Sequence, residues 1–250
     1  MERITSRKNP LAVRIKKLGA NRSYREENGE FLCDGIKLLE DAALSVAEIL
    51  TVLTASHVPF PLPVETRVYY ADRSLIDSLS PLKNAQDTLF TCRLPQAVKT
   101  FEKNGTHILL DRMQDPGNVG AIIRTANAFG IKSVILTDGS ADPYNPKTLR
   151  ASMGAIFRQS LSQASMSELV AMKDYGARFI GAVHAGCCRD VSTVNLKDSI
   201  IAIGSEGRGL SNDILALCEQ LFTIPISNEC ESLNAAAAAA IIIWEARNTS

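Results

Sequence analysis

The sequence predicts an α/β protein of two domains, the second built on an open parallel sheet. From residue 107 onward, short and uniformly apolar runs alternate with helical segments, a pattern typical of strands covered on both faces by helices. Shorter strand-like runs and helices come before it, and a polar stretch separates the two parts. We therefore expect a small α/β domain over residues 1–95, a linker over 96–105 and a larger domain over 106–250.

In the first domain, strand-like and helical segments alternate at short intervals. The expected strands are residues 29–35, 47–53, 68–70 and 88–92, and the expected helices are residues 36–43 and 74–80. Residues 58–64 alternate proline with apolar residues. Because proline has no amide hydrogen for a sheet ladder, this run is expected to be a loop.

The second domain shows five apolar runs, each followed by a helical segment. The expected strands are residues 107–111, 133–137, 178–183, 200–204 and 221–226. The expected helices are residues 119–129, 146–156, 166–175, 211–220 and 232–247. Open sheets of this kind bind ligands at the carboxyl ends of their strands, so the residues that follow each strand are the candidates for chemistry.

Charge and composition exclude some functions. The net charge is zero, but the first 25 residues hold eight lysines and arginines against the single acid Glu2. This segment is either a phosphate-binding arm or a solvated helix face. No apolar run approaches the roughly 20 residues of a membrane span. The charged N-terminus is not followed by the apolar segment of a secretory signal. We expect a cytoplasmic protein without membrane contact.

The first candidate segment, residues 118–126, follows the first strand of the second domain. Asn118 is placed to cap the next helix, and Arg124 lies off the apolar stripe of that helix. Taken singly, each has a plain structural explanation, a helix cap and a surface arginine.

The second segment, residues 203–210, follows the fourth strand and is rich in glycine. Its spacing, Gly204-Ser205-Glu206-Gly207-Arg208-Gly209, matches neither a phosphate-binding loop nor a dinucleotide fingerprint. A glutamate in such a loop suits a cationic ligand or an arginine better than a phosphate.

The third segment follows the fifth strand. It comprises residues 224–226 and Ser232-Leu233-Asn234, followed by six alanines that predict a tightly packed helix. Ser232 is the expected cap of that helix.

Together and in this order, the three segments resemble the signature motifs of the SpoU/TrmH-type RNA ribose methyltransferases of the SPOUT class. The resemblance covers about residues 105–250. Residues 1–95 are more loosely similar to the small ribosomal-protein-like RNA-binding domain of many members. The third motif departs from the family pattern at Ala235-Ala236, where valine or serine is common, but it retains Ser232 and Asn234.

The resemblance implies transfer of a methyl group from S-adenosylmethionine to an RNA ribose 2′-hydroxyl, with no metal. It also implies a deep trefoil knot in the second domain and a homodimer whose interface completes each active site. The catalytic residues carried over are Arg124, Asn118, Glu206, Ser232 and Asn234. The donor-binding residues carried over are Gly204, Gly207, Ile224 and Leu233. Since arginine is effectively always protonated, we expect Arg124 to stabilise developing charge rather than to act as a base.

The separate first domain favours ribosomal RNA over transfer RNA as the substrate. A non-catalytic RNA-binding protein on the same fold is the main alternative. A dinucleotide-dependent enzyme is disfavoured because the fingerprint is missing. A SPOUT enzyme that methylates a base is disfavoured by the Ser232-Leu233-Asn234 segment.

Overall fold

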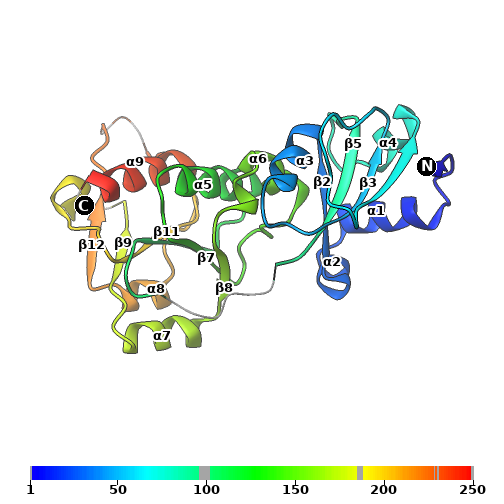
Figure 1. Cartoon of the computed structure of the whole chain (residues 1–250). Coiled ribbons are helices and arrows are strands. Elements are labelled where there is room, and N and C mark those ends of the chain that lie inside the picture. Colours follow the sequence, from blue (N-terminus) through cyan, green and yellow to red (C-terminus); the bar gives the residue numbers. More distant parts are fainter. Residues whose placement is uncertain (1, 96–101, 185–187, 228, 230, 249–250) are drawn as a thin grey trace. The chain divides into compact units, whose positions relative to one another are not determined.

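The computed structural model describes residues 2–95, 102–184, 188–227, 229 and 231–248 (Figure 1). The chain divides into two compact units. The N-terminal unit is Met1–Gln96 with Asp142–Arg158, and the C-terminal unit is Ala97–Ala141 with Gln159–Ser250. Most of the expected linker, residues 96–101, lies outside the described residues.

The N-terminal unit contains a mixed sheet in the order β1-β4-β3-β5-β2. Its strands are β1 (Glu2–Ile4), β2 (Glu30–Asp34), β3 (Ile49–Thr54), β4 (Arg67–Ala71) and β5 (Thr88–Arg93). Its first helices are α1 (Pro10–Ala20), α2 (Arg22–Asn28), α3 (Ile36–Ala43) and α4 (Arg73–Leu79). The four expected strands and both expected helices are present, and residues 58–64 form a loop.

The basic segment at the start of the chain is folded into this unit. Ala12, Ile15 and Leu18 on α1 are at most 1% exposed, and they pack on one face of the sheet with Leu75 and Ile76 of α4. The apolar spacing of α1 therefore makes it part of the core, with its basic side chains on the outer face.

The other face of this sheet is covered partly by residues from the second half of the sequence. Phe31 of β2 packs against Tyr144 and Phe157, with ring centroids 4.9 and 6.5 Å apart respectively. The buried Arg25 forms an ion pair with Asp142 at 2.5 Å. These contacts explain why Asp142–Arg158 belongs to the N-terminal unit, although the sequence assigned it to the second domain.

The helix expected over residues 146–156 is shorter than predicted. α6 spans Pro146–Ser152, and a 3₁₀ turn, Ala155–Phe157, follows it. Between them Met153 and Gly154 adopt positive φ angles of 47° and 81°, which no continuous helix can contain.

Within the described residues, the C-terminal unit has a parallel sheet of seven strands in the order β10-β12-β9-β11-β6-β7-β8. The expected strands are β6 (His107–Asp111), β7 (Ser133–Thr137), β9 (Phe179–Ala182), β11 (Ile200–Gly204) and β12 (Gln220–Thr223). Two further strands, β8 (Leu161–Ala164) and β10 (Arg189–Asp190), lie at the two edges of the sheet. Edge strands need fewer apolar residues, and these two lack the apolar runs that marked the others.

Helices cover both faces of this sheet. In Figure 1, α5 (Pro116–Ala128) and α9 (Ala235–Asn248) lie on one face, and α7 (Met166–Asp174) and α8 (Asn212–Leu217) lie on the other. Leu169, Ile214 and Leu217 from α7 and α8 pack on Phe179 and Ile200 of the sheet. The parallel α/β architecture predicted for the second domain is therefore confirmed. No described helix has the length and apolarity needed to cross a bilayer.

Candidate functional site

The strand order reverses at β6, whose neighbours are β7 on one side and β11 on the other. The carboxyl ends of β6 and β11 are level, with Gly204 paired to Asp111. A crevice at such a reversal is the usual ligand site of an open parallel sheet. The first and second sequence motifs both begin here.

The loop after β11, residues 204–210, is called the glycine loop below. Its backbone folds back on itself, because the amide of Gly209 donates to the carbonyl of Ser205 at 2.9 Å. A Cβ on Gly204 would overlap the carbonyl group of Gly209 and the amide nitrogen of Leu210, whereas one on Gly207 would meet nothing within 4 Å. Gly204 is thus required by the close approach of backbone to backbone, and Gly207 is not.

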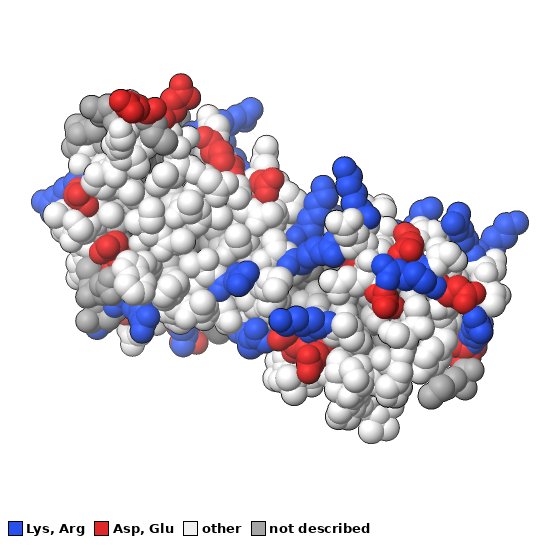
Figure 2. Space-filling view, turned by 90° about the horizontal axis from the view of Figure 1, so that it is seen from above, with Lys and Arg blue, Asp and Glu red and all other residues white. Residues whose placement is uncertain are grey.

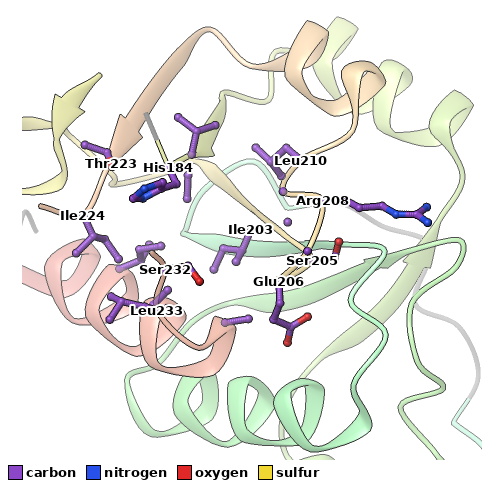
Figure 3. Close-up of a pocket in the computed structure, with 18 of the residues that line it drawn as sticks. His184, Ile203, Ser205, Glu206, Arg208, Leu210, Thr223, Ile224, Ser232 and Leu233 are labelled. Carbon is purple, nitrogen blue, oxygen red and sulfur yellow. The ribbon is translucent and has the colours of Figure 1, made fainter. Parts of the chain in front are cut away.

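A cavity of about 360 Å³ lies between the glycine loop, the segment after β12 and the start of α9 (Figure 3). Six of the predicted site residues line it: Gly204, Glu206, Gly207, Ile224, Ser232 and Leu233. His184, which follows β9, and Thr223, at the end of β12, also line it and were not predicted. Both follow the rule that chemistry gathers at the carboxyl ends of strands, which is the signal that would have found them.

Three predicted polar residues, one from each motif, form a hydrogen-bonded row beside the cavity. The Asn118 Nδ2 donates to the Glu206 Oε1, and the Asn234 Nδ2 donates to the Asn118 Oδ1 at 3.1 Å. The Asn234 Oδ1 accepts from the amides of Ala236 and Ala237 at 3.0 and 3.2 Å. The cap of α9 therefore fixes the orientation of the Asn234 amide and, through it, that of Asn118.

Both expected helix caps are wrong. Asp115 caps α5, since its Oδ1 accepts from the amide of Asn118 at 2.9 Å. Asn234, and not Ser232, caps α9. The two residues that were expected to cap lie in the site instead. Asn118 belongs to the hydrogen-bonded row, and Ser232 lines the cavity.

Arg124 is exposed on α5 and does not line the cavity. Within the described part of the chain, no carboxylate or hydrogen-bond partner of its guanidinium is found. Arg124 is therefore the predicted catalytic residue that this single chain does not bring to the others.

A buried carboxylate that the sequence did not single out anchors the end of the glycine loop. Asp111, 2% exposed, accepts at Oδ2 from the amide of Ser211 at 2.6 Å and at Oδ1 from the Thr137 hydroxyl at 3.2 Å. Ser211 directly follows the glycine loop and caps α8. Asp111 thus fastens the loop to the ends of β6 and β7.

Known proteins resemble the chain in sequence. It is 29% identical over 253 residues to the 23S rRNA (guanosine(2553)-2′-O)-methyltransferase RlmP of Bacillus subtilis, covering 99% of this chain and 100% of that protein. It is 30% identical over 283 residues to the 23S rRNA (uridine(2479)-2′-O)-methyltransferase of Streptomyces viridochromogenes, covering 98% and 91%.

Solved structures resemble it in fold. The SpoU methyltransferase AviRb of Streptomyces viridochromogenes, in complex with AdoMet, superposes with a TM-score of 0.85 at 27% identity, covering 96% of this chain and 98% of that one. The AdoMet-bound rRNA methyltransferase of Sinorhizobium meliloti gives 0.87 at 27% identity, covering 99% and 97%. The sequence model of the SpoU rRNA Methylase family matches residues 105–244, more than half of the chain. The chain belongs to this family.

Proposed function

We propose that the protein transfers a methyl group from S-adenosylmethionine to a ribose 2′-hydroxyl of ribosomal RNA. The observation that carries this is the cavity enclosed by the second and third motifs, with the row Glu206–Asn118–Asn234 beside it. The named relatives support it, since two act on the ribose 2′-O of 23S rRNA. One relative modifies a guanosine and the other a uridine. The identity of the nucleoside that this chain methylates therefore cannot be transferred from them.

The cavity fits the methyl donor. A volume of about 360 Å³ is within the usual range for small-molecule sites, about 300–1,000 Å³. Ile224 and Leu233 supply apolar walls, and Gly204 and Gly207 of the glycine loop line the cavity without side chains. When bound, S-adenosylmethionine supplies an electrophilic methyl group on a positively charged sulfonium. In our proposal the backbone groups of Gly204, Gly207, Ile224 and Leu233 hold the donor.

We assign Arg124 the task of stabilising negative charge on the ribose oxygen as the methyl group is transferred. Its guanidinium stays protonated, and a fixed cation at a developing anion is a strong catalytic device. Asn118, Glu206 and Asn234, held in one hydrogen-bonded row, would orient the ribose, with Ser232 on the cavity wall. The chain's own groups then suffice without a metal.

The test is Arg124→Ala. Methyl transfer to 23S rRNA should fall about 100- to 1,000-fold, the effect of losing about 3–4 kcal/mol of charge stabilisation in the transition state. Donor affinity, measured by calorimetry, should not change, because we assign Arg124 to the ribose oxygen and not to the donor, and it does not line the cavity of its own chain. A variant that retains the wild-type rate would remove Arg124 from the mechanism.

The wild-type protein tests the alternatives. If it binds donor and RNA but transfers no methyl group, the non-catalytic alternative is favoured. If it methylates transfer RNA alone, the proposed substrate is wrong.

We also propose a homodimer in which Arg124 of one copy serves the cavity of the other. Trp244 and Ile241 of α9 are 47% and 38% exposed, and Phe129 packs edge-on against Trp244 at 5.6 Å. Figure 2, viewed from the side of α5 and α9, shows a broad area of the C-terminal unit without charged side chains. An uncharged area that carries exposed apolar side chains such as Trp244 and Ile241 suits a second copy.

Mixing two inactive variants tests this arrangement. Arg124→Ala lacks the cation, and Leu233→Glu would block the donor cavity. If each site uses groups from both copies, mixed dimers contain one intact site and activity returns. A mixture that stays inactive, or a monomer by sedimentation that methylates RNA, would refute the proposal.

We propose that the N-terminal unit binds RNA through the outer face of α1 and the segment before it. Four of the eight basic residues there have carboxylate partners: Arg3 with Asp72, Arg14 with Glu30, Arg22 with Glu26, and Arg25 with Asp142. Arg7, Lys8, Lys16 and Lys17 are exposed, and no carboxylate partner of theirs is seen in the described residues. These four are the cations available for phosphate contacts.

Point variants test this surface better than deletion of the arm, because removing α1 would expose Ile15 and Leu18 of the core. The double variant Lys16→Gln, Lys17→Gln should lower the slope of log affinity against log salt by about 0.7–0.9 for each phosphate that the protein no longer neutralises. Arg22→Gln is the control, since Arg22 is already paired with Glu26 within α2. Equal slopes for all three proteins would show a solvated surface only.

Two further features belong to the proposal. The family resemblance supports a deep trefoil knot near the C-terminus, and the full burial of Ala239 on α9 suits so close a passage of chain. An experimental structure with an unthreaded chain would refute the knot.

We also propose that the protein acts in the cytoplasm, where ribosomal RNA is made and assembled in bacteria. Fractionation of cells tests this proposal.

A further inference from the structure

Arg112, the residue after β6, has an unusual backbone conformation. Its φ angle is +51°, in the left-handed region that long side chains rarely adopt and that glycine adopts freely. Strained residues of this kind persist where the surrounding structure enforces them, and they gather at functional sites. The question is what holds Arg112 there and what its side chain does.

The backbone of Arg112 is held from the neighbouring strand. Its amide donates to the Thr137 Oγ1 at 3.0 Å, and the Thr137 hydroxyl in turn donates to the Asp111 Oδ1 at 3.2 Å. The Arg112 Nε lies 3.5 Å from the same carboxylate oxygen. The backbone of Arg112 is therefore fixed by a hydrogen bond, and its side chain lies next to the buried carboxylate of Asp111.

The guanidinium is only partly used by these contacts. The side chain of Arg112 is 39% exposed, whereas that of Asp111 is 3% exposed. Nε is the guanidinium nitrogen nearest to Asp111, but it is buried and has no hydrogen-bond partner. Within the described residues, no hydrogen bond from the two terminal nitrogens to the protein is found. A guanidinium whose terminal nitrogens form no hydrogen bond with the protein presents a planar pair of donors to an incoming anion.

The position of Arg112 ties it to the methyl-donor site. The other oxygen of Asp111 accepts from Ser211, the residue that directly follows the glycine loop. One buried carboxylate thus sets both the glycine loop and Arg112 at the carboxyl edge of the sheet. Arg112 does not line the donor cavity, so the carboxylate of the methyl donor is not the anion it is built for.

We propose that Arg112 is an RNA-binding residue of the C-terminal unit that contacts a phosphodiester of the strand being methylated. The inference rests on the proposed function, because RNA is the polyanion that must approach this edge of the sheet. A rigid phosphate contact fixed to the same carboxylate as the glycine loop would hold the RNA backbone in register with the donor. Phosphate contacts set position and register without reading sequence.

Arg112→Gly is the decisive variant. It removes the cation and relieves the left-handed backbone strain. Asp111 keeps its hydrogen bonds from Thr137 and Ser211, so the chain should still fold. Lys132→Gln is the matched control: Lys132 precedes β7 at the opposite edge of the sheet, is 47% exposed and is paired with Glu102 at 2.7 Å. Each variant removes one positive charge from the full-length protein.

The measurement is affinity for 23S ribosomal RNA at several salt concentrations, with donor affinity followed by calorimetry. Arg112→Gly should lower the salt slope by about 0.7–0.9 and leave donor affinity unchanged, and Lys132→Gln should match wild type. Wild-type protein that binds RNA with the same slope as Arg112→Gly would overturn the inference. So would a loss of donor affinity, which would assign Arg112 to the donor. If wild-type protein binds no RNA at any salt concentration, the proposed function fails instead.

Discussion

Gly204→Ala is the substitution for which the structure makes the strongest prediction. The added methyl group would overlap the carbonyl of Gly209 and the amide nitrogen of Leu210. Both are backbone atoms that no rotamer change can move aside, so the glycine loop must open. Inserting one methylene group into a well-packed site typically costs about 1–3 kcal/mol. Since the loop forms a wall of the cavity, we expect donor affinity to fall by a similar free energy, about 5- to 150-fold.

Gly207→Ala is the control within the same loop. A Cβ there meets nothing within 4 Å, so the stability of the ligand-free protein should not change. Urea unfolding without donor would compare the two variants, and calorimetry would measure donor binding to Gly204→Ala. The reasoning is refuted if Gly204→Ala matches wild type in both measurements, or if Gly207→Ala destabilises the free protein as much as Gly204→Ala does.

Three other substitutions have defined outcomes. Arg25→Met leaves Asp142 without its buried partner and should cost about 3–5 kcal/mol in urea unfolding, whereas Arg22→Met, in an exposed pair, should cost at most about 1 kcal/mol; similar losses would contradict this. Burial lowers the pKa of His107, so its contribution to stability should be complete above about pH 6.5 and fall away as the pH decreases, as unfolding from about pH 5 to 7.5 would show. His107→Gln should lack that dependence. Asn234→Asp keeps the oxygen that caps α9 but loses the donor to Asn118, so melting temperature should hold while methyl transfer falls; unchanged transfer would remove the row from the mechanism.

The regular part of the fold was predictable because its causes are local. α3 has the predicted bounds. β6 and β7 match the predicted runs residue for residue, since a buried parallel strand has a nearly continuous apolar run at its centre. β8 was missed because Leu161–Ala164 is an edge strand with two polar residues in four. The break after α6 was missed because Met153, a good helix former, adopts a left-handed conformation there.

The site was predictable in composition but not in arrangement. The motifs named the cavity residues, yet the caps expected from the sequence were Asn118 and Ser232, whereas Asp115 and Asn234 cap the two helices. Pro116 at the first helical position was the available signal that Asp115 caps α5. Asp111 could not have been singled out, because its role depends on Thr137 and Ser211, which are 26 and 100 residues away along the chain.

A count of charged residues in the sequence can overestimate or underestimate the cations that are available to bind RNA. Eight cations in the first 25 residues suggested a strongly basic arm, but ion pairs neutralise half of them, and Arg25 is buried with Asp142. Conversely, Arg112 directly follows Asp111 in the sequence, so a count of charges cancels the two. In the structure that carboxylate accepts hydrogen bonds from Thr137 and Ser211, whereas the Arg112 Nε lies 3.5 Å from it and forms no hydrogen bond. Affinity for a polyanion depends on which cations keep unused donors at the surface, and only the folded chain decides that.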